Sequence, residues 1–268
     1  MDDTSIAVSA DLKGRVVLIT GAASGIGRAT ALLAGYRGAA VAVVDINGDA
    51  ARQVADEVLA QGSPATVGLE CDVADADAVD RTFEKATATL GSVDALLANA
   101  GMLIPGRVND ISVEDWDRQI AVNLRGVFLC CRRAIIDMIA QGEGGSIVCT
   151  SSPNGEASLP EIPAYAASKG GISALVRALA VDHAVDRIRV NAISPGATET
   201  GMMWDGVDPS DVERLRGVLN AEIPLGRIAD PIEPARAAVW LLSNEAAYVT
   251  GSHIHIDGGI SARASLSA

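Results

Sequence analysis

Aromatic residues are scarce in this sequence. They make up 3% of the chain, whereas hydrophobic residues as a whole make up 49% and charged residues 21%. This balance is that of a globular chain with enough apolar material for a sizeable core. Because large rings are rare, the core has to be built from Ala, Val, Ile and Leu. Such residues suit the strands of a parallel sheet, which helices cover on both faces.

Positive charge is also in short supply. Lys and Arg together number 21 against 34 Asp and Glu, so the formal net charge is -13. Contact with a phosphate backbone requires clustered Lys and Arg, so no nucleic-acid partner is expected. No apolar run reaches the length of a membrane span, so no membrane partner is expected either. Residues 1–12 are polar and acidic, and they lack the basic and apolar regions of a signal peptide.

Cysteine and histidine are few. The four cysteines form no C-x-x-C pair and lie in apolar or strand-like contexts: Cys71, Cys130, Cys131 and Cys149. We interpret them as reduced core thiols of a cytoplasmic protein. The three histidines, His183, His253 and His255, are too few and too poorly placed for a catalytic zinc site, so no metal is expected. His253 and His255 alternate along a strand, and we expect them to face a subunit contact or solvent.

Apolar runs of strand length alternate with longer helical segments along the whole chain. The runs span residues 15–20, 39–44, 65–70, 93–98, 145–150, 187–193 and 252–256. A repeated strand–helix order predicts an α/β fold with a doubly wound parallel sheet. No boundary separates a second unit, so residues 1–268 are expected to form a single domain, with 1–12 as a loose lead-in.

A glycine-rich turn joins the first strand to the first helix. It runs from Gly21 to Gly27 with the spacing G-x-x-x-G-x-G. Glycine lets the backbone approach a pyrophosphate closely, and the helix N-terminus offers free N–H groups. Asp45 ends the second strand, where a carboxylate binds ribose hydroxyls and repels a 2′-phosphate. This favours NAD over NADP, while Asp45 also suits the N-cap of a helix beginning near Gly48.

Polar residues recur where later strands end. Asp72 suits either contact with an adenine or capping of the helix over 75–90. Asn99, Ala100 and Gly101 follow the fourth strand, and they are small enough for a cofactor to pass close to the backbone. Asn123 falls inside a helical region over 113–139, where Asn competes for backbone hydrogen bonds. It is either a solvent-face accident or a deliberate local break.

Tyr165 and Lys169 stand four residues apart at the start of a helix that reaches about His183. This spacing puts both side chains on one helix face. A nearby positive charge favours a phenolate, so the pair suits a general base. Ser152, delivered by the fifth strand, reaches the same substrate oxygen if the intervening loop folds back. The alternative is an exposed tyrosine beside a solvated lysine.

Residues 200–226 form a long segment between the sixth strand and the next helix. Loops of this length are usually functional or disordered. Residues 209–220 have helical periodicity and suit a lid, and Met202, Met203 and Trp204 suit an apolar substrate wall. Core packing explains these three residues nearly as well. We expect this segment to act as a substrate loop or lid.

These motifs, taken together, resemble the classical short-chain dehydrogenases/reductases. They are Thr20-Gly-Ala-Ala-Ser-Gly-Ile-Gly27, Asn99-Ala-Gly101, Asn123, Ser152, Tyr165-Ala-Ala-Ser-Lys169 and Pro195-Gly196. The resemblance covers about residues 12–260, and the joint order of the motifs makes it specific. It implies a Rossmann-type domain that binds NAD. It also implies a homotetramer, with dimer contacts through the helices after Ile111 and Ser168.

The resemblance assigns roles to particular residues. Tyr165 would be the general acid/base, Lys169 would lower its pKa and hold a ribose, Ser152 would bind the substrate oxygen, and Asn123 would hold a relay water. The cofactor would lie along Gly21, Ser24, Gly25, Ile26, Gly27, Asp45, Ile46, Asp72, Val73, Asn99, Ala100, Gly101, Tyr165, Lys169, Pro195, Gly196, Thr198 and Thr200.

The expected function is the NAD-dependent interconversion of a secondary alcohol, cyclic or aromatic, and its ketone. A 3-oxoacyl-carrier-protein reductase is an alternative, but it would normally use NADPH, which Asp45 disfavours. A non-catalytic NAD-binding sensor is an alternative of another class. Such proteins usually lose the Tyr or the Lys, and Tyr165 and Lys169 are both present here. The sequence also lacks the G-x-S-x-G turn of a hydrolase.

Overall fold

Runs of aliphatic and β-branched residues form seven strands in one sheet. The structure is a computed structural model, and it describes residues 11–263. Its strands are β1 (Val16–Thr20), β2 (Ala40–Asp45), β3 (Thr66–Glu70), β4 (Ala95–Ala98), β5 (Gly145–Thr150), β6 (Ile188–Pro195) and β7 (His253–Ile256). They lie in the order β3-β2-β1-β4-β5-β6-β7, and neighbouring strands pair in parallel. The strand order reverses between the neighbouring strands β1 and β4, and sheets of this kind bind ligands at such a switch point.

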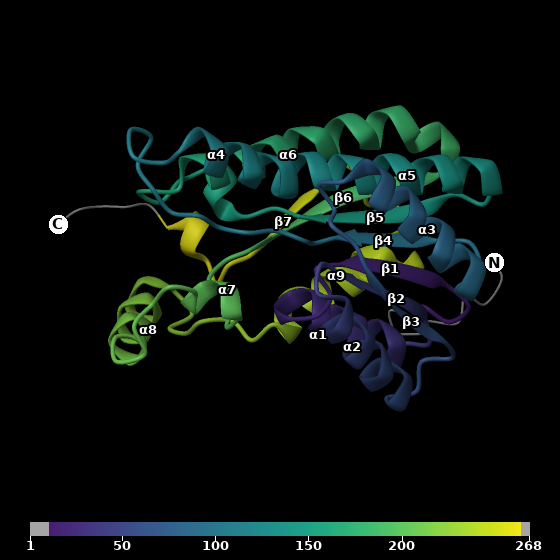
Figure 1. Cartoon of the computed structure of the whole chain (residues 1–268), viewed down its shortest axis with the longest axis horizontal. Helices are drawn as coiled ribbons and strands as arrows, with labels where there is room; N and C mark the ends of the chain where they lie inside the picture. Colours follow the sequence, from purple (N-terminus) through teal and green to yellow (C-terminus); the bar gives the residue numbers. More distant parts are fainter. Residues whose placement is uncertain (1–10, 264–268) are drawn as a thin grey trace, which may run out of the picture.

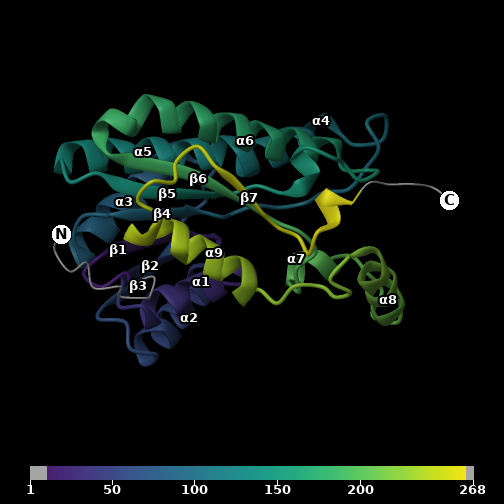
Figure 2. The same ribbon diagram turned by 180° about the vertical axis from the view of Figure 1, so that it is seen from behind.

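Helices cover both faces of the sheet (Figures 1 and 2). One face carries α1 (Gly25–Tyr36), α2 (Gly48–Ala60) and α9 (Ile232–Leu242). The other carries α3 (Ala76–Leu90), α5 (Gly126–Gln141) and α6 (Pro163–His183). Each face has its own core, built mainly from Ala, Val, Ile and Leu, and among residues 11–263 Phe83 is the one aromatic residue buried in either. The predicted α/β fold of the Rossmann type is confirmed.

The region predicted as one helix over 113–139 is interrupted. It consists of α4 (Val113–Ile120), the π-helical turn η1 (Ala121–Arg125) and α5. Asn123 lies in the middle of η1 and is fully buried. The local break is therefore confirmed, and the solvent-face alternative is wrong. π-turns of this kind are frequent at functional sites.

The long segment over 200–226 contains two helices, α7 (Gly201–Trp204) and α8 (Val212–Glu222). Figure 1 shows both beyond the carboxyl ends of the strands, with α8 at the far end of the molecule. The base of the segment is fixed, because Ala229 accepts a hydrogen bond from the backbone N–H of Glu199 at 2.9 Å and donates one to Ala197 at 3.0 Å. The helical periodicity predicted over 209–220 is confirmed.

Two further predictions concern the N-terminal lead-in and the four cysteines. Most of the predicted lead-in, residues 1–10, lies outside the described residues, but Leu12 is fully buried in the core. The four cysteines are buried and unpaired, as predicted. Within residues 11–263, no helix combines the length and the apolar character needed to cross a bilayer.

Candidate functional site

In the glycine-rich turn after β1, the positions of Gly21 and Gly27 leave no room for a side chain. A Cβ on Gly27 would lie 2.1 Å from the carbonyl oxygen of Gly21, and Gly21 itself has a φ of +64°. Such a φ is costly for residues with a Cβ. The amide of Asn99 donates to the carbonyl oxygens of Thr20 and Gly21 at 3.1 and 3.2 Å. The turn is thus held in one shape, with its backbone against the end of β4.

The N-terminus of α1 is open for an anion. Ser24 is the N-cap, but its side chain accepts no hydrogen bond from the first turn, and the first turn carries no acidic residue. Free N–H groups and the positive end of the helix dipole favour phosphate at such a place. Gly25 and Ile26 begin the helix, and Gly25 has no side chain to block the approach. The pyrophosphate of a dinucleotide therefore fits these residues.

Asp45 is at the end of β2, beside that turn. Its carboxylate accepts hydrogen bonds from the backbone N–H groups of Ala23 and Asn47, both at 3.0 Å. The N-cap of α2 is Asn47, whose side chain accepts from Ala50 N at 3.1 Å. The alternative of Asp45 as a helix cap is therefore wrong. Two bonds fix the carboxylate at the place where a ribose is expected, and Ile46 beside it is exposed.

Asp72 and Val73 lie at the end of β3. The side chain of Asp72 accepts from Ala74 N at 2.9 Å, whereas Asp75 is the N-cap of α3. The alternative of Asp72 as that cap is therefore wrong. Val73 is buried, and a Cβ on Gly126 would lie 2.8 Å from its Cγ2. Val73 thus fixes the distance between this end of the sheet and α5.

Asn99 has a scaffold role that sequence reasoning missed. Besides its bonds to the glycine-rich turn, its Oδ1 accepts from the Thr150 hydroxyl at 3.1 Å. The side chain of Asn99 is therefore occupied within the protein and holds three strand ends together. The backbone N–H groups of Asn99 and Ala100 donate to the Thr20 hydroxyl as well, so what remains to face a cofactor is their carbonyl groups and the backbone of Gly101.

Tyr165 and Lys169 share one face of α6, as predicted. The ammonium of Lys169 lies 5.4 Å from the centre of the Tyr165 ring and donates to the carbonyl oxygen of Thr150 at 2.7 Å. Lys169 is 3% exposed, so the alternative of a solvated lysine is wrong. Burial lowers the pKa of Lys169 to about 8. The ammonium is thus predominantly charged at neutral pH.

The pKa of Tyr165 is raised, whereas the sequence predicted that Lys169 would lower it. Burial raises the pKa of its phenol, and a hydrogen bond with Ser152 acts in the opposite direction. Lys169 is not among the groups that shift this pKa. The ammonium donates to the carbonyl oxygen of Thr150 and lies over the Tyr165 ring. Ser152 is the residue that counteracts the effect of burial.

Asn123 is held by the backbone after β4. Its amide oxygen accepts from Met102 N, and its amide nitrogen donates to Met102 O, both at 2.8 Å. A Cβ on Gly101 would lie 3.5 Å from Asn123 Oδ1 and 3.7 Å from Lys169 Nζ. The amide of Asn123 and the ammonium of Lys169 therefore both border the space that a side chain on Gly101 would occupy.

Four residues of the predicted cofactor path lie at the end of β6 or just after it: Pro195, Gly196, Thr198 and Thr200. Pro195 ends the strand, and a Cβ on Gly196 would lie 2.8 Å from Asp257 Cα. Thr198 is buried, and its hydroxyl donates to Gly196 O at 3.0 Å. Thr200 comes close to the glycine-rich turn, since a Cβ on Gly25 would lie 3.0 Å from its Cγ2. The structure thus brings both halves of the predicted cofactor path to one edge of the sheet.

Glu199 is a residue that sequence reasoning missed. Its carboxylate forms an ion pair with Arg216 of α8 and accepts from Trp204 Nε1 of α7 at 2.7 Å. Arg216 lowers the pKa of Glu199. One carboxylate therefore joins both helices of the 200–226 segment. Nothing in the spacing of these residues signals the contact, because they are brought together only by the turn between α7 and α8.

Two hollows border the site. One of about 470 Å³ lies between the loops before α4 and before α6, near the start of the helix that carries Tyr165. It is lined by Arg107, Val108, Asn109, Ser158, Leu159, Pro160, Glu161, Ile162 and Pro163. The other, of about 840 Å³, lies between α1, α7 and the start of α9, on the outer side of α1. Pro163, which lines the smaller hollow, is the first residue of α6.

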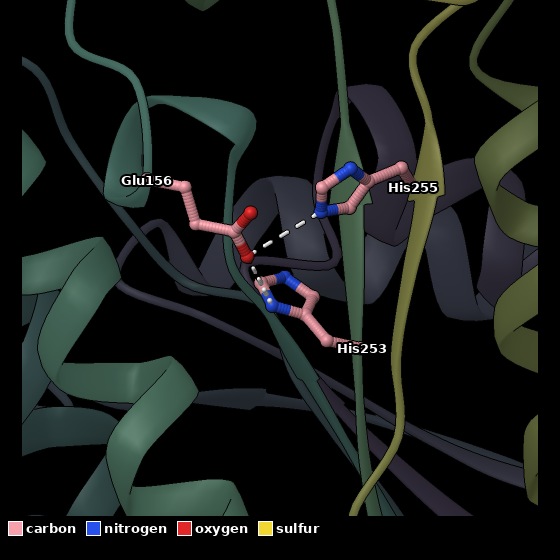
Figure 3. Close-up of side chains that lie close together, drawn as sticks. All are labelled: Glu156, His253 and His255. Carbon is pink, nitrogen blue, oxygen red and sulfur yellow. Dashed lines mark ion pairs between the residues drawn. The ribbon is translucent and has the colours of Figure 1, made fainter. Parts of the chain in front are cut away.

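A second polar cluster lies at the end of β7. His253 and His255 both point at Glu156, which follows the short helix η2 (Pro153–Gly155) after Ser152 (Figure 3). Glu156 Oε1 is 3.2 Å from His253 Nδ1 and 3.5 Å from His255 Nε2. The prediction that His253 faces solvent or another subunit is wrong, since its side chain is 15% exposed and contacts Ser173 and Ser194.

Comparisons with known proteins agree with this geometry. A family model described as "Enoyl-(Acyl carrier protein) reductase" matches residues 21–261. The 2,5-dichloro-2,5-cyclohexadiene-1,4-diol dehydrogenase of Sphingobium indicum is 39% identical over 253 residues, which are 94% of this chain and 99% of that protein. The cyclohexanol dehydrogenase of an Acinetobacter species is 36% identical over 259 residues, which are 96% of this chain and 98% of that protein.

Solved structures give the same result. Levodione reductase superposes with a TM-score of 0.90 at 33% identity, covering 94% of this chain and 99% of that one. A short-chain type dehydrogenase/reductase from Mycobacterium marinum superposes with a TM-score of 0.88 at 36% identity, covering 95% and 98%. By its family match, its relatives and its fold, this chain belongs to the short-chain dehydrogenase/reductase family.

Proposed function

We propose that this protein is an NAD-dependent oxidoreductase that interconverts a cyclic secondary alcohol and its ketone, with Tyr165 as the general acid/base. Family membership supports an oxidoreductase acting on CH–OH groups. The observation that carries the proposal is the position of three residues beside the glycine-rich turn. Ser152 follows the carboxyl end of β5, and Tyr165 and Lys169 lie in the first turns of α6. Relatives named for cyclohexanol and for cis-4-hydroxycyclohexanecarboxylate favour a ring-shaped substrate.

The chain's own groups handle the substrate and its proton. The hydroxyl of Ser152 lowers the pKa of the Tyr165 phenol, so the two groups are neighbours and would hold one substrate oxygen between them. Tyr165 takes the hydroxyl proton in oxidation and returns it in reduction. NAD, when bound, supplies the redox chemistry by accepting or giving a hydride. Lys169 holds a positive charge near the phenol, where it would hold the ribose of bound NAD, and Asn123 faces the same space beside Gly101.

Asp45 supports NAD as the cofactor. Its carboxylate is fixed by two backbone N–H groups beside the phosphate turn, where it would accept from ribose hydroxyls and repel a 2′-phosphate. Ala23, within the turn, offers no positive charge to offset that repulsion, and neither does Ile46. We further propose a cytoplasmic homotetramer, for which the exposed apolar residues of α5 and α6 are the support.

The test is turnover with a panel of cyclic and aromatic secondary alcohols, followed by the appearance of NADH. Tyr165→Phe is expected to lower kcat/KM by about 10²–10⁴-fold, the usual contribution of a general acid/base. Tyr248→Phe is the matched control, because Tyr248 is fully exposed after α9. A Tyr165→Phe enzyme with the full rate would overturn the proposed mechanism.

Two further assays separate the rival functions. Rates with NADH and NADPH are compared side by side, and a clear preference for NADPH would favour a 3-oxoacyl-carrier-protein reductase. Short 3-oxoacyl and enoyl thioesters are included as substrates, because the matching family model is named for an acyl-carrier-protein enzyme. Binding of NAD without oxidation of any alcohol in the panel would favour the sensor.

A further inference from the structure

Three metal-binding side chains converge on the α6 side of β7, outside the proposed catalytic group. His253 and His255 are two residues apart on a strand, so both point to the same face of the sheet. Ile254 and Ile256 point to the other face and pack against the α9 core. Glu156 approaches the two imidazoles from the turn after Ser152 (Figure 3). The candidate ligand atoms of the three residues all lie within 4.8 Å of one another.

The distances suit a tetrahedral ion. Zinc binds His nitrogen and Glu oxygen at about 2.0–2.2 Å, so neighbouring ligand atoms in a tetrahedral site are about 3.3–3.6 Å apart. Glu156 Oε1 lies 3.2 Å from His253 Nδ1 and 3.5 Å from His255 Nε2. One carboxylate oxygen is thus at ligand spacing from both imidazoles. A His₂Glu set with an open fourth position is an established zinc geometry.

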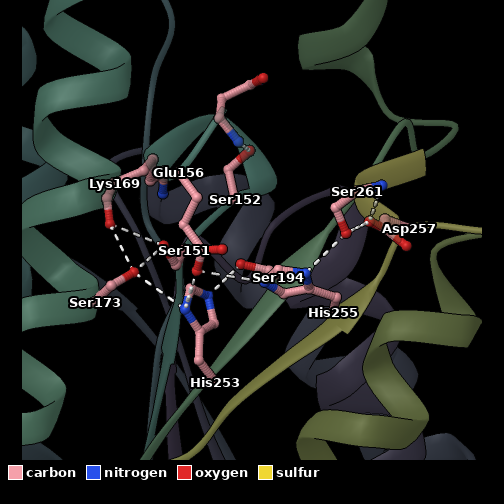
Figure 4. A network of polar contacts seen from close by, with 11 residues as sticks. Ser151, Ser152, Glu156, Lys169, Ser173, Ser194, His253, His255, Asp257 and Ser261 are labelled. Atoms are coloured by element: carbon pink, nitrogen blue, oxygen red, sulfur yellow. Dashed lines mark hydrogen bonds and ion pairs between the residues drawn. The ribbon is translucent and has the colours of Figure 1, made fainter. Parts of the chain in front are cut away.

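The other nitrogen of each imidazole is occupied by a serine (Figure 4). His255 Nδ1 is 2.9 Å from the hydroxyl of Ser261, which in turn hydrogen-bonds the carboxylate of Asp257. His253 Nε2 is hydrogen-bonded to the hydroxyl of Ser194. Outer partners of this kind fix the orientation of metal-binding histidines. They leave His255 Nε2 to face Glu156, and His253 Nδ1 to face Glu156 and Ser173.

Hydrogen bonds within the cluster explain this arrangement less well than a bound cation does. Glu156 Oε1 alone faces both rings, and the ring centres are 5.1 Å apart, so protonating both histidines to pair with it would bring two positive charges together. The contact of His253 Nδ1 with Ser173 Oγ, at 3.2 Å, is replaceable, because Ser173 also reaches Lys169 O and Ser151 Oγ. A divalent cation satisfies all three ligand atoms at once.

We propose that Glu156, His253 and His255 bind a zinc ion. The ion would connect β7 to the turn that directly follows Ser152, and Ser173 connects the same cluster to Ser151 and Lys169. Its role is to position this turn, since the cluster holds none of the groups assigned to proton transfer. Zinc binding itself does not rest on the proposed function.

The test uses full-length protein without a histidine tag, freed of metal with a chelator. Zinc is titrated in competition with a chromophoric chelator, and thermal unfolding is followed with and without zinc. We expect one zinc per chain, with a dissociation constant of about 1 μM or tighter, and a higher unfolding temperature with zinc. Because loss of an outer partner alone weakens metal binding about 10–100-fold, Glu156→Gln and His255→Gln are expected to lose at least 100-fold.

The controls use other side chains of the same chain. His183→Gln removes a histidine whose partner within residues 11–263 is Asp186, at 2.9 Å, and is expected to leave zinc binding unchanged. Ser261→Ala removes an outer partner and is expected to weaken binding about 10–100-fold. The Glu156 side chain is 54% exposed, so Glu156→Gln is expected to fold, which circular dichroism checks. Equal zinc binding by wild type and His255→Gln, or no binding at one equivalent, would overturn the proposal.

Discussion

At the scale of single residues, the buried ammonium of Lys169 is the charge that the fold has to accommodate. It is 3% exposed, and its hydrogen-bond acceptor is the neutral carbonyl of Thr150. Burying a charged group without an opposite charge destabilises the folded state. Its retention beside Tyr165 therefore indicates a functional rather than a stabilising role.

Replacing this ammonium is expected to change how stability depends on pH. Burial lowers the pKa of Lys169 from 10.5 to about 8. Between these two values the unfolded chain binds more protons than the folded one, so the stability of the wild type rises with pH. Below pH 8 the buried charge is destabilising, and Lys169→Met is expected to be the more stable protein. Its advantage shrinks above pH 8, by about 3 kcal/mol in total at 1.36 kcal/mol per pKa unit.

Urea unfolding of both proteins below pH 8 and again at about pH 10 measures this difference. Lys85→Met, which removes an exposed ammonium of α3, is the matched control. A Lys169→Met advantage that stays constant or grows with pH would contradict the assigned burial.

At the scale of elements, the interruption between α4 and α5 places a polar group where a regular helix would not. The π-turn η1 directs Asn123 into the protein, where both its amide atoms bond the backbone of Met102. This contact joins α4 and α5 to the segment after β4. The interruption therefore connects the helix layer to the edge of the sheet that carries the site.

The segment over 200–226 is the element that we expect to control substrate access. Glu199→Gln keeps the size of the side chain but removes the charge that pairs with Arg216. Because this carboxylate joins α7 to α8, we expect the segment to become looser and KM for the alcohol to rise about 3–30-fold, with kcat changed less. Steady-state kinetics over a range of alcohol concentrations measures both constants.

Glu213→Gln is the matched control for that experiment. Glu213 also pairs with Arg216, at 3.2 Å, but its side chain is 84% exposed and lies on α8 itself. The Glu213 side chain does not connect α7 to α8. The KM of Glu213→Gln for the alcohol is therefore expected to stay near that of wild type. An equal rise in both variants would show that charge on Arg216, rather than the connection between α7 and α8, is what matters.

At the scale of the whole molecule, one outer layer carries apolar side chains that the fold does not cover. Phe128, Ile136 and Ile139 of α5 are 44%, 47% and 46% exposed, and Val181 of α6 is 77% exposed. The three residues of α5 recur at spacings of eight and three, which places them on one face of the helix. A stripe of this kind is typical of an interface between subunits.

The expected occupant of this face is a second copy of the chain. Ile136→Asp would place a charge in the contact, and we expect it to reduce a tetramer to dimers or monomers. Sedimentation velocity or light scattering measures the mass. Tyr36→Asp, on the exposed side of α1, is the control and is expected to leave the assembly unchanged. A wild-type protein that is monomeric at all concentrations would contradict the expectation.

The sequence by itself determined the fold and most of the proposed site. Strand-length apolar runs, separated by helices, allow one parallel sheet, and the residues after each strand must then meet at one edge. Gly21, Asp45 and Ser152 end or follow a strand, and Tyr165 lies in the first turn of α6, so each is placed by its neighbours along the chain. Local pattern is sufficient where neighbours along the chain decide the position.

Only the tertiary structure decided which side chains contact one another across elements. Asn99 joins three strand ends, Glu199 joins α7 to α8, and Glu156 meets His253 and His255 from almost a hundred residues away. The raised pKa of Tyr165 is likewise a result of burial, which no spacing reveals. These features depend on how loops and helices pack in space, and packing sets distances that the periodicity of a single segment does not encode.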